Sequence, residues 1–431
     1  MPQNFTPDSG PDWLGDAHRH LWLPYTQMQT AAAPLAAIAT SGARITLADG
    51  RHLIDGIASW WTACHGYNHP HIRQAVNAQL AQMPHVMLGG LVNEPASRLA
   101  ARLAALAPGD LNHVFFSESG SVAVEIALKM ALQYWLNRGH KGRTKFVCFR
   151  DGYHGDTLGA MSVCDPDESM HHLFKGALLQ QFIADLPRSR EQYDALDAFL
   201  QSHRGEIAGM IVEPLVQGAG GMKFHVPDVL RDLRALCDRH GLLLILDEIM
   251  TGFGRTGTLF ACEQAEIVPD IMTLSKALTG GTMALAATLA SGEIYRAFLG
   301  EDDAMALMHG PTYMGNALAC AAANASLDLF ATEPRLAQVA AIAAHLRTAL
   351  APCAAMHGVR DVRVMGAIGV VQLQNMKARD WFKQRFVEEG VWLRPFGDIV
   401  YTTPPFTIAM DELHHLTRTM VKLIGEWSAK Q

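Results

Sequence analysis

The feature that most constrains this chain is an alternation of short apolar runs with longer amphipathic stretches. The runs have the length of strands and little polar interruption, which is typical of strands buried on both faces. We expect six strands, at 113–119, 145–151, 208–214, 242–248, 271–276 and 287–291. Such strands, separated by helices, predict an α/β fold with a mostly parallel sheet covered on both faces.

Two of the intervening segments have clear helical patterns. Residues 121–135 form one of them, and the other places Leu230, Leu233 and Cys237 on one face before a left-handed stop at Gly241. The alternation extends from residue 60 to 330, whereas the two ends of the chain are more mixed. We therefore predict a large domain at 60–330 and a smaller α+β domain built from 1–59, which includes an N-terminal arm, and 331–431.

Composition narrows the classes of function. The chain has 431 residues, is 49% hydrophobic and carries a formal net charge of -7, with Lys and Arg scattered along it. We therefore expect neither nucleic acid nor a membrane surface as a partner. The seven cysteines include no CxxC pair, which favours reduced thiols and a cytoplasmic location.

The termini and apolar runs carry no targeting or membrane signal in this interpretation. The first fifteen residues are polar and rich in Pro and Gly, so they predict a loose arm rather than a signal peptide. No apolar run approaches the roughly 20 residues that a membrane span needs.

Two motifs resemble nucleotide-binding sequences. The run "LLLILDE" (242–248) has the form of a Walker-B strand, but the chain contains no Gly-Lys dipeptide for the partner motif. "GFGRTG" (252–257) has dinucleotide-loop spacing, yet it neither follows a strand directly nor opens a helix. We therefore interpret "GFGRTG" as a connection between two strand ends.

The strands at 242–248 and 271–276 carry charged residues of opposite sign at their carboxyl ends, Asp247 and Lys276. Ligands gather at this edge of parallel sheets. Either residue alone fits a solvated loop or a helix cap. Together they meet the two demands of pyridoxal 5'-phosphate (PLP), an amine for its aldehyde and an anion for its ring nitrogen.

PLP also needs a phosphate site, and Gly120 and Ser121 stand where a strand runs into a helix whose N-terminus favours an anion. By themselves they fit an ordinary helix cap. Tyr153 follows another strand end, where an aromatic ring stacks on a cofactor or packs in the core.

The stretch 242–281 resembles the signature of the class III aminotransferases, PLP-dependent enzymes of fold type I. The resemblance extends over nearly the whole chain, including "SWW" (59–61), "GYHGDTLGAMSVCDPD" (152–167), "HGPTYMGN" (309–316) and "RPFG" (394–397). It implies that Lys276 joins the cofactor and moves substrate protons, and that Asp247 pairs with the ring nitrogen. Gly120 and Ser121 would bind phosphate, and Tyr153 would stack on the ring.

The same resemblance implies a homodimer with active sites at the subunit interface. In this family the residues that match Pro311 and Thr312 reach the phosphate of the neighbouring subunit's cofactor.

Within the family, the resemblance is closest to members of the biotin pathway that take nitrogen from S-adenosylmethionine. It implies substrate-binding roles for Tyr25, Trp60, Asp156, Lys276, Gly310 and Arg394. Arg394 matches the arginine that receives a substrate carboxylate. We expect the segment around Trp60 and Trp61 to be β-rich, so that the two rings point to opposite sides.

The implied reaction moves the amino group of S-adenosylmethionine to 8-amino-7-oxononanoate, giving 7,8-diaminononanoate by ping-pong kinetics through pyridoxamine phosphate. Two alternatives remain. One is an ω-amino-acid aminotransferase of the same class, which "SWW" and "GYHGDTLGAMS" disfavour. The other is a binding protein that has lost catalysis, which would be expected to lack Lys276 or Asp247.

Overall fold

A computed structural model describes residues 11–167 and 172–431. Its largest sheet has seven strands in the order β4-β12-β11-β10-β7-β5-β6. The strands are β4 (His113–Ser117), β5 (Lys145–Phe149), β6 (Phe182–Ala184), β7 (Ile207–Val212), β10 (Leu243–Asp247), β11 (Ile271–Leu274) and β12 (Ala286–Ala290). Strand β12 runs antiparallel to both of its neighbours, β4 and β11, whereas the other four pairings in this sheet are parallel. The predicted mostly parallel, mixed sheet is therefore confirmed.

All six predicted strands are present. Their side chains are largely buried because helices cover both faces of the sheet. Within β10, Leu243 and Ile245 belong to the core on one face, and Leu244 and Leu246 to the core on the other. The short edge strand β6 was not predicted.

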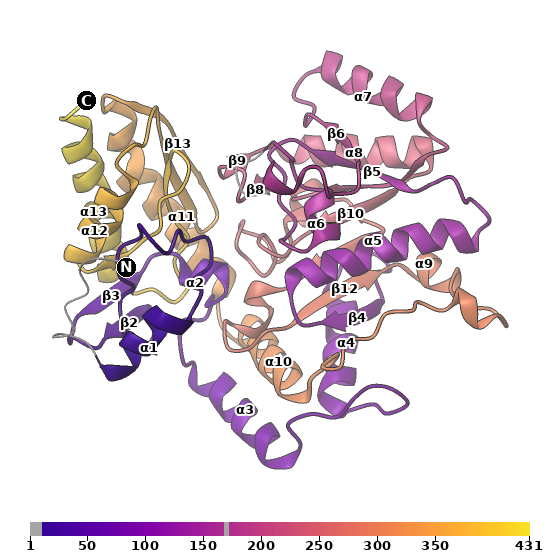
Figure 1. Cartoon of the computed structure of the whole chain (residues 1–431), viewed down its shortest axis with the longest axis horizontal. Helices are drawn as coiled ribbons and strands as arrows, with labels where there is room; N and C mark the ends of the chain where they lie inside the picture. Colours follow the sequence, from indigo (N-terminus) through magenta and orange to yellow (C-terminus); the bar gives the residue numbers. More distant parts are fainter. Residues whose placement is uncertain (1–10, 168–171) are drawn as a thin grey trace.

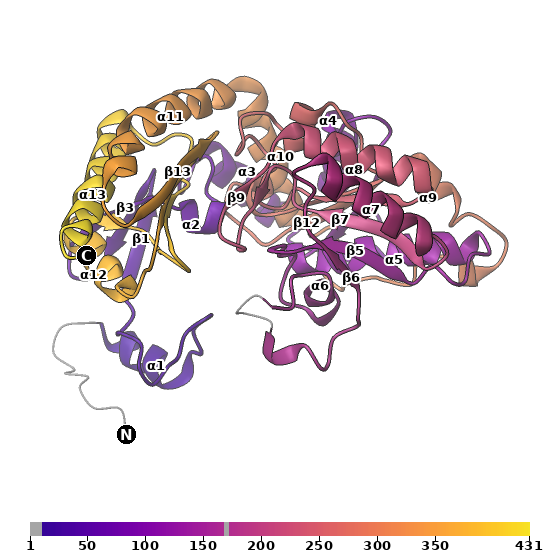
Figure 2. The ribbon, with the colours of Figure 1, turned by 90° about the horizontal axis from the view of Figure 1, so that it is seen from above.

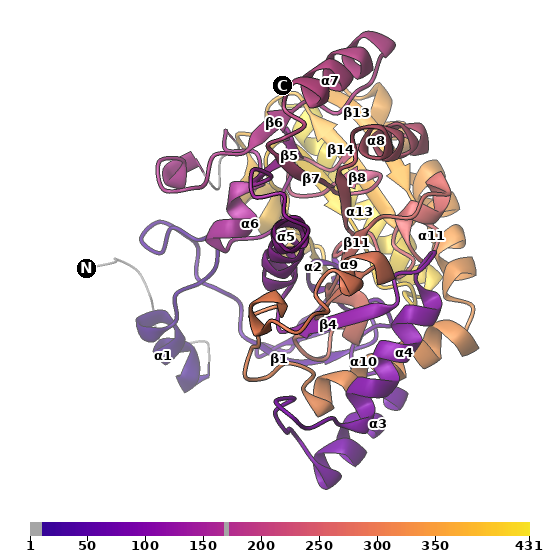
Figure 3. The same cartoon turned by 90° about the vertical axis from the view of Figure 1, so that its right-hand side faces the viewer.

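Helix α5 (Gly120–Asn137) covers the first of these faces and α8 (Pro227–His240) the second, as Figure 3 shows with α5 seen nearly end-on. Leu230, Leu233 and Cys237 of α8 are fully buried, and Gly241 ends the helix in the left-handed conformation. Both predicted helices are confirmed.

A second lobe combines strands from the two terminal parts of the described chain, 37–55 and 359–402 (Figure 1). One sheet, in the order β1-β2-β3-β15, combines strands β1 (Ala37–Ser41), β2 (Arg44–Leu47), β3 (His52–Asp55) and β15 (Val391–Trp392). The other combines β13 (Val359–Met365), β14 (Ile368–Leu373) and β16 (Ile399–Thr402). Figure 2 shows this lobe beside the seven-stranded sheet. The domain boundaries at 59 and 330 stay predictions.

The remaining elements cover these sheets or connect them. The α-helices are α1 (Asp12–His20), α2 (Ala58–Trp61), α3 (Pro70–Gln82), α4 (Glu94–Leu106), α6 (Leu158–Ser162), α7 (Arg190–Ser202), α9 (Gly292–Arg296), α10 (Ala317–Thr332), α11 (Arg335–Leu350), α12 (Arg379–Glu388) and α13 (Met410–Ser428). The 3-10 helices are η1 (His172–Phe174), η2 (Ala261–Ala265), η3 (Lys276–Thr279), η4 (Asp303–Met305) and η5 (Ala351–Ala355). A two-stranded ribbon pairs β8 (Val216–Gln217) with β9 (Lys223–Phe224).

Two features, one near the N-terminus and one at 335–355, differ from expectation. The predicted loose arm lies outside the described residues over 1–10, but from Asp12 the chain forms α1, whose acidic first turn and basic last turn suit the helix dipole. The segment Arg335–Ala355 is long and apolar enough to cross a membrane by length and composition alone. A core helix passes the same test, and Val339, Ile342 and Leu346 of this segment are buried in the core beside β13 and β14.

Candidate active site

Asp247 is the last residue of β10 and is almost completely buried. One carboxylate oxygen, Oδ2, lies 2.7 Å from Nδ1 of His154, and the other accepts hydrogen bonds from the Ile249 N–H and the Thr273 hydroxyl. Polar partners therefore hold a buried carboxylate at the carboxyl edge of the sheet, where the sequence predicted it.

Glu213 is a second buried carboxylate, and the sequence interpretation did not single it out. It follows β7 and accepts hydrogen bonds from the N–H groups of Tyr153 (3.0 Å) and Gly218 (2.9 Å). Burial raises the pKa of Glu213 to about 7; the charge of His154 opposes this shift, and that of Asp247 adds to it. The signal was present in the sequence, because Glu213 ends an apolar run just as Asp247 does.

Lys276 follows β11 after one intervening residue, Ser275, and opens η3 with a left-handed backbone (φ 44°). Its side chain is partly buried. Burial lowers the pKa of the Lys276 ammonium, while the charges of Asp247, Glu213 and Asp156 oppose the shift. A lowered pKa favours the neutral amine, which is the nucleophilic form. We call Asp247, His154, Glu213 and Lys276 the buried centre.

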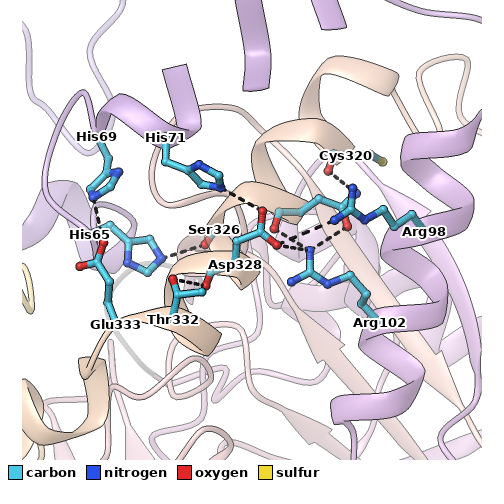
Figure 4. A network of polar contacts seen from close by, with 11 residues as sticks. His65, His69, His71, Arg98, Arg102, Cys320, Ser326, Asp328, Thr332 and Glu333 are labelled. Carbon is cyan, nitrogen blue, oxygen red and sulfur yellow. Dashed lines mark hydrogen bonds and ion pairs between the residues drawn. The ribbon is translucent and has the colours of Figure 1, made fainter. Parts of the chain in front are cut away.

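A polar chain supports the turn that follows Lys276. The Ala277 carbonyl accepts a hydrogen bond from the Ser326 hydroxyl (3.4 Å), and Ser326 contacts Nε2 of His65 (3.0 Å). Figure 4 shows the Ser326–His65 contact beside the cluster in which Asp328 pairs with His71 and Arg102. Helix α10, which carries Ser326 and Asp328, is thereby tied to the segment behind Lys276.

Helix α5 begins at Gly120, and its open N–H groups suit an anion. The Ser119 side chain accepts from the Val122 N–H, whereas the N–H groups of Gly120 and Ser121 have no acceptor in the parts of the chain that the structure describes. Two free backbone donors at the positive end of an 18-residue helix fit a phosphate group.

The loop that carries Tyr153 lies directly against this helix start. The Ser121 hydroxyl accepts from the Thr157 N–H (3.0 Å), and Glu125 of α5 accepts from the Thr157 hydroxyl (2.5 Å). Gly155 has φ +130°, and a Cβ there would lie 2.2 Å from Ser121 Oγ. Only glycine permits this close approach, so the anion site and the loop form one unit.

Tyr25, Trp60, Asp156 and Arg394 come from four segments, and we call them the rim. The Tyr25 hydroxyl donates to Asp156 Oδ2, and the Tyr153 hydroxyl donates to Asp156 Oδ1 at 3.0 Å. Burial, with the Asp156 hydrogen bond next in size, raises the pKa of Tyr25 to about 12. The ring of Tyr25 meets that of Trp60 edge-on, with centroids 6.3 Å apart.

Arg394 places its guanidinium over the Trp60 ring, 5.4 Å from the centroid. It is partly buried, and it has no hydrogen bond or ion pair with residues 11–167 or 172–431. A planar guanidinium without a partner beside an aromatic wall suits a substrate carboxylate. The structure thus brings the predicted rim residues together.

The backbone at Trp60 and Trp61 differs from the expected β-rich run. Residues 58–61 form a left-handed turn, α2, with φ between 45° and 78°. Such a conformation costs non-glycine residues about 1–2 kcal/mol each. The two rings still point apart, because Trp60 is 39% exposed while Trp61 is buried and stacks on Tyr401.

Gly310, Pro311 and Thr312 lie in the segment before α10 and are not brought to the buried centre. The Thr312 carbonyl contacts His85 Nε2 at 3.1 Å. No hydrogen bond among the described residues joins these three to Asp247 or Lys276. Gly310 and Thr312 are exposed, and Pro311 is partly exposed.

The stretch "GFGRTG" forms a series of turns between β10 and η2, as predicted, rather than a strand-to-helix loop. Its Arg255 is buried and donates to the carbonyls of Ala367 and Pro404. This segment therefore connects the two lobes.

Comparison with known proteins agrees with this geometry. The family model for class III aminotransferases matches residues 25–424. A relative from Mycobacterium leprae is 46% identical over 94% of this chain and 95% of its own length, and one from Corynebacterium glutamicum is 44% identical over 92% and 94%. Both are named adenosylmethionine-8-amino-7-oxononanoate aminotransferase.

Solved structures lead to the same class. The enzyme of that name from Methanocaldococcus jannaschii superposes with a TM-score of 0.91 at 33% identity, covering 96% of this chain and 98% of its own. A PLP-bound amine transaminase from an uncultivated Pseudomonas species gives 0.88 at 32% identity, covering 94% and 98%.

The chain therefore belongs to the class III aminotransferases, and within them to the adenosylmethionine-8-amino-7-oxononanoate aminotransferase family. Class III aminotransferases are PLP-dependent transaminases of fold type I.

Proposed function

We propose that this protein transfers the amino group of S-adenosylmethionine to 8-amino-7-oxononanoate, giving 7,8-diaminononanoate for biotin biosynthesis. The observation that carries the proposal is the rim, where Tyr25, Trp60, Asp156 and Arg394 meet beside the buried centre. The names of relatives that share over 40% of their residues with this chain support the same assignment.

The residues of the site fit PLP. The N–H groups of Gly120 and Ser121 would hold its phosphate, Tyr153 would cover its ring and Asp247 would face its ring nitrogen. Bound PLP supplies an aldehyde that carries the amino group and a ring that accepts electrons. His154 and two further donors would hold the Asp247 carboxylate where it faces that nitrogen.

Lys276 would move the proton between the substrate α-carbon and the cofactor carbon that carried the aldehyde. Its buried surroundings favour the neutral amine, which accepts a proton, and the nearby carboxylates stabilise the ammonium that results. The left-handed backbone and the hydrogen-bonded Ala277 carbonyl hold the side chain in place.

The rim would bind both substrates in turn. Arg394 would receive a carboxylate, while the aromatic faces of Tyr25 and Trp60 and the charge of Asp156 would favour the sulfonium of S-adenosylmethionine. Since the substrates share one site, initial-rate plots should give parallel lines.

We also propose a homodimer in which Gly310, Pro311 and Thr312 complete the partner's site. Two observations support this: Gly310 and Thr312 are exposed, and no hydrogen bond among the described residues joins the three to Asp247 or Lys276. An interface would also require exposed apolar side chains nearby. The segment before α10 exposes Met308 and Tyr313, and the loop between α3 and α4, whose His85 stacks on Tyr313, exposes Met87 and Val92.

The deciding experiment adds S-adenosylmethionine, alanine or γ-aminobutyrate to separate samples of the PLP-loaded protein. We expect only S-adenosylmethionine to convert the absorbance of the lysine-bound cofactor into that of pyridoxamine phosphate. This conversion with the simple amines but not with S-adenosylmethionine would replace the proposal with an ω-amino-acid aminotransferase.

A further inference from the structure

The left-handed turn at Ala58–Trp61 decides where the Trp60 ring lies. All four residues have positive φ, and none is glycine. L-residues rarely hold this conformation in succession, so contacts from outside the turn must stabilise it. The turn directs Trp60 to the rim and Trp61 into the core.

A buried carboxylate, that of Asp55, supplies such contacts to Ile57, which precedes the turn, and to Ser59 within it. Oδ1 of Asp55 accepts from the Ile57 N–H at 2.9 Å, and Oδ2 accepts from the Ser59 N–H at 2.7 Å. The Tyr67 hydroxyl also donates to Oδ2 at 2.5 Å and contacts the Ser59 hydroxyl. Asp55 has no exposed surface, so these donors replace its hydration.

Gly56, the first of two residues between Asp55 and the turn, is packed against the segment that leads to Arg394. The Gly56 N–H donates to the Trp392 carbonyl at 3.0 Å, and Trp392 is the register partner of Asp55. A Cβ on Gly56 would lie 2.6 Å from the Leu393 side chain. The start of the turn and the backbone before Arg394 are therefore held as one piece.

We infer that Asp55 is a positioning residue: its carboxylate locks the Ala58–Trp61 turn so that Trp60 stands beside Arg394 and Tyr25 as a wall of the substrate pocket. The lock itself rests on the contacts above. Its effect on S-adenosylmethionine rests on the proposed function.

The first test observes Trp60 without turnover. The PLP-loaded protein is labelled with 5-fluorotryptophan, and the Trp60 signal among the eight tryptophans is assigned with Trp60→Phe. In Asp55→Asn, the amide NH2 replaces one of the two oxygens, so it faces either the Ile57 N–H or the Ser59 N–H and the Tyr67 hydroxyl. We expect the Trp60 fluorine resonance to shift or broaden, while the Trp61 resonance changes less.

A rescue variant separates the lock from general damage. Glycine adopts positive φ without steric cost, and Ser59 is exposed, so Ser59→Gly should restore the Trp60 resonance in the Asp55→Asn background. Asp49→Asn is the matched control. Asp49 also accepts a hydrogen bond from a backbone N–H, that of Arg51, but it is exposed and its hydrogen bonds go to Arg51 rather than to the turn. Asp49→Asn should leave the resonance unchanged.

Kinetics provide the second measurement. Asp55→Asn should raise the KM for S-adenosylmethionine about tenfold with a smaller change in kcat, because buried donors lose their acceptor while Lys276 is untouched. Ser59→Gly should recover most of this loss. A fall in kcat alone, with KM unchanged, would contradict a role in positioning the pocket wall.

The two proposals fail in different ways. An unchanged Trp60 resonance in Asp55→Asn, or no rescue by Ser59→Gly, overturns the lock even if the wild-type protein uses S-adenosylmethionine. A shifted and rescued resonance supports the lock even if the wild-type protein rejects that substrate. If Asp55→Asn does not fold, Tyr67→Phe removes one donor only and should shift the same resonance; an unchanged signal there also overturns the inference.

Discussion

The buried centre and the rim differ in how the chain positions them. Asp247 ends β10, Glu213 directly follows β7, and Lys276 lies two residues after the end of β11, all in one sheet. Strand β10 pairs in register with both neighbours. The rim residues come from loops and turns that lie far apart in the sequence. Under the proposed function, the sheet would position the groups that carry out the chemistry, and tertiary contacts would position those that select the substrate.

The strongest test of this division is Lys276→Ala. Because this change removes the amine that would both join the cofactor and carry protons, we expect kcat to fall by about 10⁴-fold or more. Steady-state assays with both substrates measure this. Activity close to that of the wild-type protein would remove Lys276 from the mechanism.

Asp247→Asn should rank second, with kcat reduced about 10³-fold, because the variant lacks the buried carboxylate that would face the cofactor ring nitrogen. Its neighbour provides a matched control: Glu248 is equally buried, but it accepts from the Thr251 hydroxyl and the Cys262 N–H. Glu248→Gln should lower stability and leave kcat nearly unchanged. Equal losses of kcat in both variants would mean that burial at this strand end matters more than the charge of Asp247.

The buried centre should also show in the pH dependence of stability. Burial raises the pKa of Glu213 from 4.5 to about 7, so the folded state binds this proton more tightly than the unfolded state. The resulting stabilisation is complete below pH 4.5 and is lost as the pH rises to about 7, on the order of 3 kcal/mol or a hundredfold in the folding equilibrium.

Urea unfolding across this pH range tests that expectation. The free energy of unfolding of the wild-type protein should fall relative to that of Glu213→Gln as the pH rises, with a constant difference above the folded-state pKa. Asp361→Asn, which changes an exposed carboxylate, should show no such trend. A parallel course of the wild-type and Glu213→Gln curves would contradict the raised pKa.

At the rim, Arg394→Ala should lower kcat/KM about thirtyfold for both substrates, because a charged hydrogen-bond donor to their carboxylates is lost. Arg360→Ala is the control, since Arg360 is exposed and lies 3.7 Å from Asp398. Loss of kcat/KM for only one substrate would show that the two do not share this contact.

The smallest effect is expected for Tyr25→Phe. It removes the hydrogen bond to Asp156 and keeps the ring beside Trp60, so kcat/KM for S-adenosylmethionine should fall about fivefold. Initial rates with 8-amino-7-oxononanoate as the varied substrate provide the comparison. A loss as large as that of Asp247→Asn would place Tyr25 in the chemistry rather than at the rim.

The same division explains what the sequence predicted. Apolar runs that end on Asp247 and Lys276 are local patterns, and the sheet places such strand ends together by its topology. The left-handed turn at Trp60 was missed because it depends on contacts that Tyr67 and the strand before Arg394 make with Asp55 and Gly56. Strand β6 was missed because three residues are too few to establish a period.

The parallel pairing of β3 with β15 has a consequence for the order of folding. Ile54 pairs with Val391, so nearly the whole chain must be synthesised before this pair can form. Contacts between such distant segments carry a large entropic cost and form slowly. We therefore expect the seven-stranded sheet to fold on the ribosome before β3 pairs with β15. The buried centre of a nascent chain would then form before the part of the rim that this pairing supports.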